Sequence, residues 1–129
     1  MAAIANTGSI ADFAYNRVDG VPAAISGTVM RQYAEANVYQ LENWTGDSIG
    51  TTSIDQKYVP FLVEMTVAQT VARMNGIGMT NNWSLGDFSV NKGEGSSTAG
   101  LQVQTALDNA KLALKSLGRK NPIYATFYG

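Results

Sequence analysis

The side chains that could do chemistry in this chain are its carboxylates. The 129 residues contain no histidine and no cysteine, which removes imidazole catalysis at neutral pH, thiol nucleophiles and most zinc sites. Carboxylates can still act as paired general acids and bases or hold a cation. The ten of them are scattered along the chain: Asp12, Asp19, Glu35, Glu42, Asp47, Asp55, Glu64, Asp87, Glu94 and Asp108. Their spacing matches no known loop or pair, so the sequence predicts no catalytic residue, no metal site and no cofactor.

Glu64 is the most informative of these acids because it is the only charge between residues 58 and 72. A lone carboxylate on an apolar helix is either a buried acid used in acid–base chemistry or a group with a cationic partner. We favour the second interpretation, with Arg31, Arg73 or a subunit interface as the partner. An enzyme is accordingly the least favoured class of function.

Four segments have the apolar periodicity of helices. The expected helices are 9–15 with Ser9 as its N-cap, 28–44 between Ser26 and Gly46, 57–74 after a capping box at 53–56, and 99–117 capped by Ser97 or Thr98. The third is apolar on nearly all sides, which predicts a central position. Pro60 predicts either a separate first turn or a kink in that helix.

Two apolar segments lie outside these helices, and we expect both to be extended. Residues 83–100 predict an arm or hairpin that is not part of the core, and its apolar residues are assigned to contacts between subunits: Trp83, Leu85, Phe88 and Val90. Residues 119–129 form a tail with a strand-like alternation, and its residues assigned to binding a neighbour are Ile123, Tyr124, Phe127 and Tyr128. Strand addition to a neighbouring molecule and folding back on the same subunit remain equal alternatives for the tail.

The overall charge is low, which limits the partners that the sequence predicts. Charged residues make up 15% of the chain and apolar residues 45%, and this shortage of charge suggests a surface partly covered by neighbours. A net charge of −1 draws the chain neither to nucleic acid nor to an acidic membrane. No stretch is apolar enough to span a bilayer, and the first residues do not resemble a signal peptide.

A small basic cluster is expected at the end of the last helix: Lys111, Lys115, Arg119 and Lys120. Cations at a helix C-terminus complement the helix dipole, which is the simpler explanation of these residues. The same side chains could touch DNA phosphates if that end of the molecule faces a channel filled with DNA.

The order of features along residues 9–128 resembles the head–tail adaptor (connector) proteins of tailed bacteriophages. The resemblance consists of the corner Asn43-Trp44-Thr45-Gly46, an apolar helix from Lys57-Tyr58-Val59-Pro60 to Arg73-Met74-Asn75, the segment Gly86-Asp87-Phe88-Ser89-Val90, and a last helix with a short tail. It implies a helical-bundle subunit of a twelve-membered ring that docks on the portal and lets the genome pass. It also implies a place at the head–tail junction of the virion after assembly in the host cytoplasm.

That resemblance assigns partners but no catalytic residues. The partners are further copies of the chain, the portal protein and the neck or tail completion proteins, with non-specific contact to double-stranded DNA in the channel and no membrane. By this likeness, residues 123–128 bind the portal or a neighbour, and residues 83–100 form an arm between subunits or toward the tail.

We therefore expect one mainly α domain over residues 1–129, a bundle of three to four helices with an extended β arm and a strand-like C-terminal tail. The expected function is structural, as an adaptor ring in the connector. The alternatives are a tail terminator, a stopper or another neck or capsid protein, and a small helical domain that binds a peptide or nucleic acid.

Overall fold

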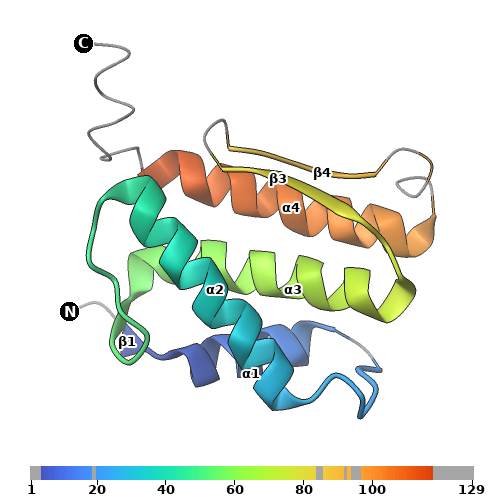
Figure 1. Cartoon of the computed structure of the whole chain (residues 1–129), viewed down its shortest axis with the longest axis horizontal. Helices are drawn as coiled ribbons and strands as arrows, with labels where there is room; N and C mark the ends of the chain where they lie inside the picture. The colour runs from blue at the N-terminus through green and yellow to red at the C-terminus, as the bar shows by residue number, and fades with distance from the viewer. Residues whose placement is uncertain (1–3, 19, 84–85, 92, 94–96, 118–129) are drawn as a thin grey trace.

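Helices make up most of the chain in the computed structural model shown in Figure 1. The structure describes residues 4–18, 20–83, 86–91, 93 and 97–117. In chain order the elements are β1 (Ile4–Ala5), α1 (Thr7–Arg17), α2 (Gly27–Thr45), β2 (Ile54–Asp55), the 3-10 turn η1 (Gln56–Tyr58), α3 (Val59–Asn75), β3 (Met79–Asn82), β4 (Asp87–Val90) and α4 (Thr98–Leu117). A mainly α bundle with a β hairpin is thereby confirmed, while the tail 119–129 lies outside the described residues.

The first helix begins earlier than the sequence suggested. Asn6 is its N-cap, because the Asn6 Oδ1 accepts a hydrogen bond from the Ser9 amide at 2.8 Å, so the prediction of Ser9 as the cap is wrong. The described residues before this helix are also structured, since Ile4–Ala5 pairs with β2. This antiparallel contact comes from a segment about fifty residues away, which no local pattern reveals.

The second helix and its two ends follow the prediction. The Ser26 Oγ accepts a hydrogen bond from the Val29 amide at 3.3 Å, and Gly46 ends the helix in the left-handed region at φ 78°. A residue with a Cβ is strained there, which explains the glycine. Of the apolar side chains that recur at three- and four-residue steps along this helix, Tyr33 is half-buried and the others are buried: Met30, Ala34, Val38, Leu41 and Trp44. This face packs against α1 and α3.

The start of α3 decides between the two alternatives that Pro60 left open. Residues 56–58 form the separate turn η1, and Pro60 lies in the first turn of α3, where no backbone N–H is needed for the helix. The predicted capping box is wrong about the cap: Asp55, not Ser53, is the N-cap of η1, and its Oδ1 accepts the Lys57 amide at 3.0 Å. The central position of α3 is confirmed, because every side chain from Phe61 to Ala68 is buried.

Strands β3 and β4 form an antiparallel hairpin that lies along α4 (Figure 1). The prediction that this segment stays outside the core is wrong at Phe88, whose side chain is only 1% exposed. The Phe61, Trp83 and Phe88 rings pack edge to face or tilted, with centroids 5.1 to 6.3 Å apart. The Gln104 side chain of α4 also bonds the backbone of β4, accepting the Val90 amide at 3.1 Å. The hairpin is therefore anchored to its own helices.

The loop between α2 and η1 is held by two carboxylates. The Glu42 Oε2 accepts the Ile49 and Gly50 amides at 2.7 and 2.8 Å, and the Tyr58 hydroxyl donates to the Asp47 Oδ2 at 2.7 Å. Burial and then this hydrogen bond raise the pKa of Tyr58 to about 12. These two acids have structural partners in the loop.

Tyr58 should make the protein lose stability at alkaline pH. The unfolded chain ionises this phenol near its ordinary pKa of 10.0, whereas the folded chain keeps it neutral up to about 12. The stabilisation is therefore complete below pH 10 and is lost as the pH rises from 10 to 12. Urea unfolding across this range measures it. The Tyr58→Phe variant should lack this component of the pH dependence, and a full pH dependence in that variant would contradict the assignment.

Candidate interaction surface

The row of valines along one side of α3 forms the floor of an open groove. Val59, Val63, Val67 and Val71 recur every four residues, so they lie on one face of the helix. The last three keep 6 to 8% of their surface exposed although they belong to the central helix. Helix α1 forms one wall and α4 the other, and we call this surface the α1–α3–α4 groove.

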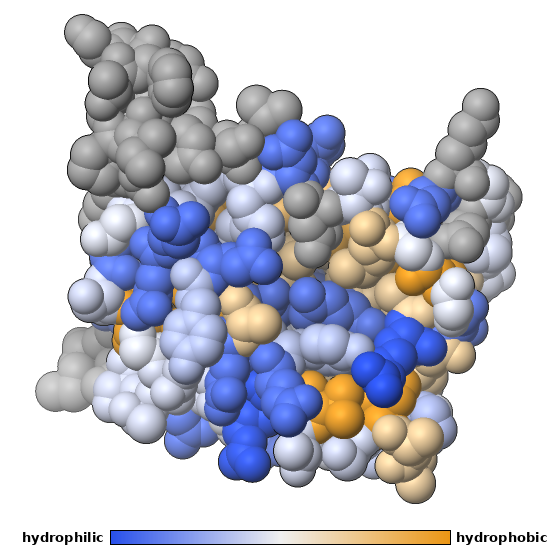
Figure 2. All heavy atoms as spheres, in the orientation of Figure 1, coloured by the Kyte–Doolittle hydropathy of each residue, from blue (hydrophilic) through white to orange (hydrophobic). Residues whose placement is uncertain are grey.

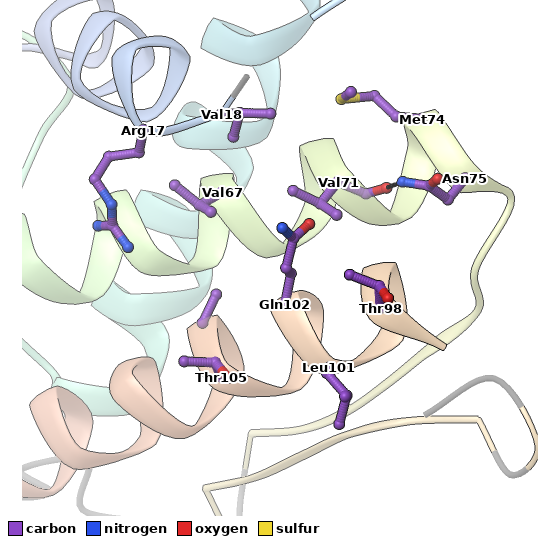
Figure 3. Close-up of a pocket in the computed structure, with 11 residues that line it drawn as sticks. Arg17, Val18, Val67, Val71, Met74, Asn75, Thr98, Leu101, Gln102 and Thr105 are labelled. Carbon is purple, nitrogen blue, oxygen red and sulfur yellow. Dashed lines mark hydrogen bonds between the residues drawn. The ribbon is translucent and has the colours of Figure 1, made fainter. Parts of the chain in front are cut away.

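The groove contains two hollows. The first, of about 440 Å³, lies toward the C-terminal end of α3 and is lined by Val67 and Val71 together with Leu101, Gln102 and Thr105 of α4 (Figure 3). In Figure 3, α3 and α4 run side by side, and the Gln102 side chain extends from α4 toward α3. The polar groups on this wall can offer hydrogen bonds to a ligand, while the valines offer an apolar floor.

The second hollow, of about 540 Å³, lies toward the N-terminal end of α3. Its apolar lining is contributed by Val59, Pro60 and Val63 of α3 and by Phe13 of α1. The Phe13 side chain is 48% exposed. Helix α1 buries Ile10 and Ala14 instead, which leaves the Phe13 ring at the edge of the groove.

Three polar side chains cross the groove between the hollows. The Arg17 guanidinium donates to both carboxylate oxygens of Glu64, at 2.7 and 3.1 Å. The Asn109 Nδ2 donates to the Glu64 Oε1 at 3.0 Å. This cluster joins α1, α3 and α4, and we call it the Arg17–Glu64–Asn109 bridge. The hydrogen bonds to Glu64 raise the pKa of Arg17 above its ordinary value.

The bridge corrects the sequence prediction for Glu64. A cationic partner was expected and is present, but it is Arg17, and neither Arg31 nor Arg73 fills this role. Arg73 instead donates to the Tyr33 hydroxyl at 3.1 Å. Glu64 thus serves as a neutralised link between helices.

The four residues predicted to form an arm between subunits lie in different environments. Trp83 and Phe88 come together beside Phe61 of their own subunit, with Phe88 in the core and Trp83 half-buried against it. Val90 is half-buried, and Leu85 lies outside the described residues. A contact between subunits through this segment stays a prediction.

Of the predicted basic cluster only Lys111 and Lys115 lie within the described residues, and the predicted tail lies outside them. Lys111 is half-buried, and its Nζ lies 4.0 Å from the Asp87 Oδ1, while Lys115 is exposed. The remaining members lie outside the described residues: Arg119, Lys120, Ile123, Tyr124, Phe127 and Tyr128. The ion pair with Asp87 gives Lys111 a role within its own subunit.

The sequence interpretation did not identify the groove, although one signal for it was present. Valine at every fourth position from 59 to 71 is visible in the chain, but a helix that is apolar all round does not reveal which side stays uncovered. The uncovered side is set by where α1, α2 and α4 pack. Figure 2 shows the face that carries α2, where hydrophilic side chains predominate and the apolar ones form small patches.

Within the described residues, no three acidic side chains gather closely enough to hold a metal ion. None of the helices described here is both long enough and apolar enough to cross a bilayer.

No family model matches the chain, and no curated protein or solved structure matches it either.

Proposed function

We propose that this chain is a structural subunit of a bacteriophage head–tail connector, an adaptor that assembles into a ring between the portal and the tail. The ring leaves a central channel for the genome. The observation that carries this proposal is the second hollow of the α1–α3–α4 groove, a concave and mainly apolar surface with the half-exposed Phe13 ring at its edge. Exposed apolar surfaces of this kind are typical of sites that bind other proteins.

The groove fits a ring because a ring needs two different surfaces on each subunit. Head-to-tail contacts between identical chains close into a ring when a receiving surface on one copy meets a distinct inserting surface on the next. The groove is concave, as a receiving surface must be, and its long axis follows α3. The Arg17–Glu64–Asn109 bridge ties the two walls to the floor, which favours a groove of constant shape.

The fold favours the adaptor over the other candidates. Tail terminators and stoppers are expected to be richer in strands, whereas the described strands here have two to four residues each. A DNA-binding module is disfavoured because one of its two described candidate lysines, Lys111, lies beside Asp87. A peptide-binding module remains distinguishable from the adaptor by stoichiometry, because it would bind one ligand as a monomer.

Electron microscopy of the chain with the portal protein of the same phage tests this proposal. We expect a coaxial ring on the portal, and a ring of twelve 13.8 kDa subunits would add about 166 kDa to the complex. Mass photometry of the same sample measures the added mass. A chain that stays monomeric and does not bind the portal at micromolar concentration would contradict the proposal.

A further inference from the structure

The second hollow presents apolar groups that are accessible at its rim. The Phe13 ring is 48% exposed, Pro60 is exposed and Val59 is half-buried, and all three line the hollow. With a volume of about 540 Å³, the hollow has room for one large side chain. Aromatic rings pack favourably against one another edge to face or offset. The second hollow therefore fits an aromatic side chain of a partner.

Tyr39 is the exposed apolar side chain of this chain that lies away from the hollow. Among the described residues, five large apolar side chains are exposed: Phe13, Tyr15, Tyr39, Leu101 and Leu112. Four of them lie on α1 or α4, the helices that form the two walls of the groove. Tyr39, which is 59% exposed, lies on α2, and no residue of α2 lines the hollow. A head-to-tail contact needs its inserting group on a different surface from its receiving one, and Tyr39 meets that need.

We infer that the second hollow receives Tyr39 of a neighbouring copy of this chain, with Glu35 of that copy beside Arg17. Tyr39 follows the buried Met30 by nine residues, or about two and a half turns, so it lies on the side of α2 opposite the buried stripe. Its ring is thus free to enter another molecule. This inference deepens the proposed function and rests on it, because it requires that copies of the chain meet head to tail.

A charged residue lies next to each of the two aromatic rings. On α2, Glu35 precedes Tyr39 by one turn, and on α1, Arg17 follows Phe13 by one turn. Residues four apart are neighbours on the surface of a helix. The Arg17 guanidinium uses two of its five N–H groups on Glu64 and can donate others. The Glu35 side chain is partly exposed, and it forms no hydrogen bond or ion pair with another described residue.

These two pairs match each other in spacing and in charge. When Tyr39 packs on Phe13, Glu35 reaches Arg17 if α2 of the inserting copy runs roughly antiparallel to α1 of the receiving copy. Arg17 then lies between two carboxylates, Glu64 of its own chain and Glu35 of the neighbour. Opposite charges across an interface fix the orientation in which two surfaces dock. The charges therefore select this orientation over the reverse one.

The polar groups at the rim suit a tyrosine. A buried tyrosine hydroxyl needs a hydrogen-bond partner. Asn16 and Asn109 both line the hollow, and a side-chain amide can donate as well as accept. Asn109 uses one N–H on Glu64 and has a second N–H and its carbonyl oxygen left. The hollow thus offers partners for the hydroxyl as well as an apolar surface for the ring.

Crosslinking between two single-cysteine variants tests the contact directly, because the natural chain has no cysteine. Asn16→Cys places a thiol at the rim of the hollow, and Ala36→Cys places one at an exposed position of α2 within one turn of Tyr39. The full-length variants are mixed, one carrying a size tag, and treated with a short bis-maleimide with and without the portal protein. We expect a mixed product that exceeds the homodimer of either variant, because the contact is head to tail.

The control mixture keeps Ala36→Cys and replaces Asn16→Cys with Thr80→Cys, which is exposed on β3, and it should give little mixed product. No mixed product in the first mixture, or an equal yield in the control, would assign the hollow to another occupant and overturn the contact. Homodimers that exceed the mixed product would show a two-fold contact and also overturn it. Rings on the portal without the mixed product would reject this contact alone. The mixed product without rings on the portal would reject the connector function alone.

Two half-exposed tyrosines provide a matched pair of variants for the same measurement. Tyr39→Ala should raise the concentration needed for half-maximal crosslinking about tenfold or more, because it removes the inserted ring. Tyr15→Ala removes a 53% exposed tyrosine that does not line the hollow, and it should leave that concentration unchanged. Tyr39→Phe should have a smaller effect than Tyr39→Ala. Circular dichroism checks that the variants are folded, and equal effects at residues 39 and 15 would overturn the contact.

Salt tests the charged part of the contact. Added salt screens exposed charges, so it should weaken crosslinking of the natural pair of surfaces. Glu35→Gln should weaken crosslinking at low salt and remove most of its dependence on salt, because the charge that meets Arg17 is gone. A salt dependence in Glu35→Gln as steep as without this substitution would overturn the assignment of Glu35 to Arg17.

Discussion

Replacing Phe61 with alanine should lower the free energy of unfolding by about 3–5 kcal/mol. Phe61 is fully buried, and its ring lies 5.1 Å from the Trp83 ring and 6.3 Å from the Phe88 ring, centroid to centroid. The substitution leaves a cavity between α3 and the hairpin and removes the aromatic contacts that anchor it. Urea unfolding followed by circular dichroism measures the loss.

Fluorescence and two further variants make this prediction specific. The chain has two tryptophans, so a Trp44→Phe background isolates the emission of Trp83, which should shift to longer wavelength in Phe61→Ala. Phe61→Leu should be clearly milder because it fills much of the cavity. Phe13→Ala removes the same ring from a half-exposed site and should lose less than about 1 kcal/mol. Similar losses at residues 61 and 13 would contradict the assignment of Phe61 to the core.

Removing the cation of the bridge should have the second largest effect. Arg17→Met leaves the Glu64 carboxylate, whose side chain is 12% exposed, with Asn109 as its remaining bridge partner. Stripping the partner from a buried charge costs roughly 3–5 kcal/mol. The Arg17 side chain is 48% exposed, so water already weakens this pair, and we expect a loss of about 1–3 kcal/mol. Urea unfolding measures it.

A double-mutant cycle shows whether the loss comes from the unpaired charge. Glu64→Gln removes the charge and keeps a group that can bond Asn109, so Arg17→Met combined with Glu64→Gln should recover much of the stability lost in Arg17→Met alone. Arg31→Met serves as the matched control, because Arg31 is an exposed arginine that takes no part in the bridge. Additive losses in the double variant, or an equal loss in the control, would show that the pair is not coupled.

The helices could be predicted because their signals are local. The apolar stripe of α2, its Ser26 cap and the glycines that end α2 and α3 are all set by residues within a few positions of one another. The predictions that were wrong concern helix ends whose positions depend on segments that are distant in the sequence. The start of α1 is fixed by Asn6 and by a hydrogen bond from the Thr7 amide to the Thr51 carbonyl.

The candidate site could be predicted only in part for the same reason. The sequence showed that Glu64 needs a cation, because an unpaired charge on an apolar helix is unfavourable. It did not show that Arg17, 47 residues earlier, supplies that cation. Phe88 was assigned to a neighbour because its short strand has a half-polar pattern, whereas packing against Phe61 and Trp83 places it in the core of its own chain.

Three properties follow from the amino-acid sequence alone: the number and approximate extent of the helices, the central place of α3 and the lack of histidine and cysteine chemistry. These properties follow from residue types and from periodicity over a few turns, which neighbours in the chain decide. Long-range packing sets which side of α3 stays open, which cation pairs with Glu64 and where the hairpin lies. Each depends on helices and strands brought together from distant parts of the chain, and the spacing of residues along one element does not contain that information.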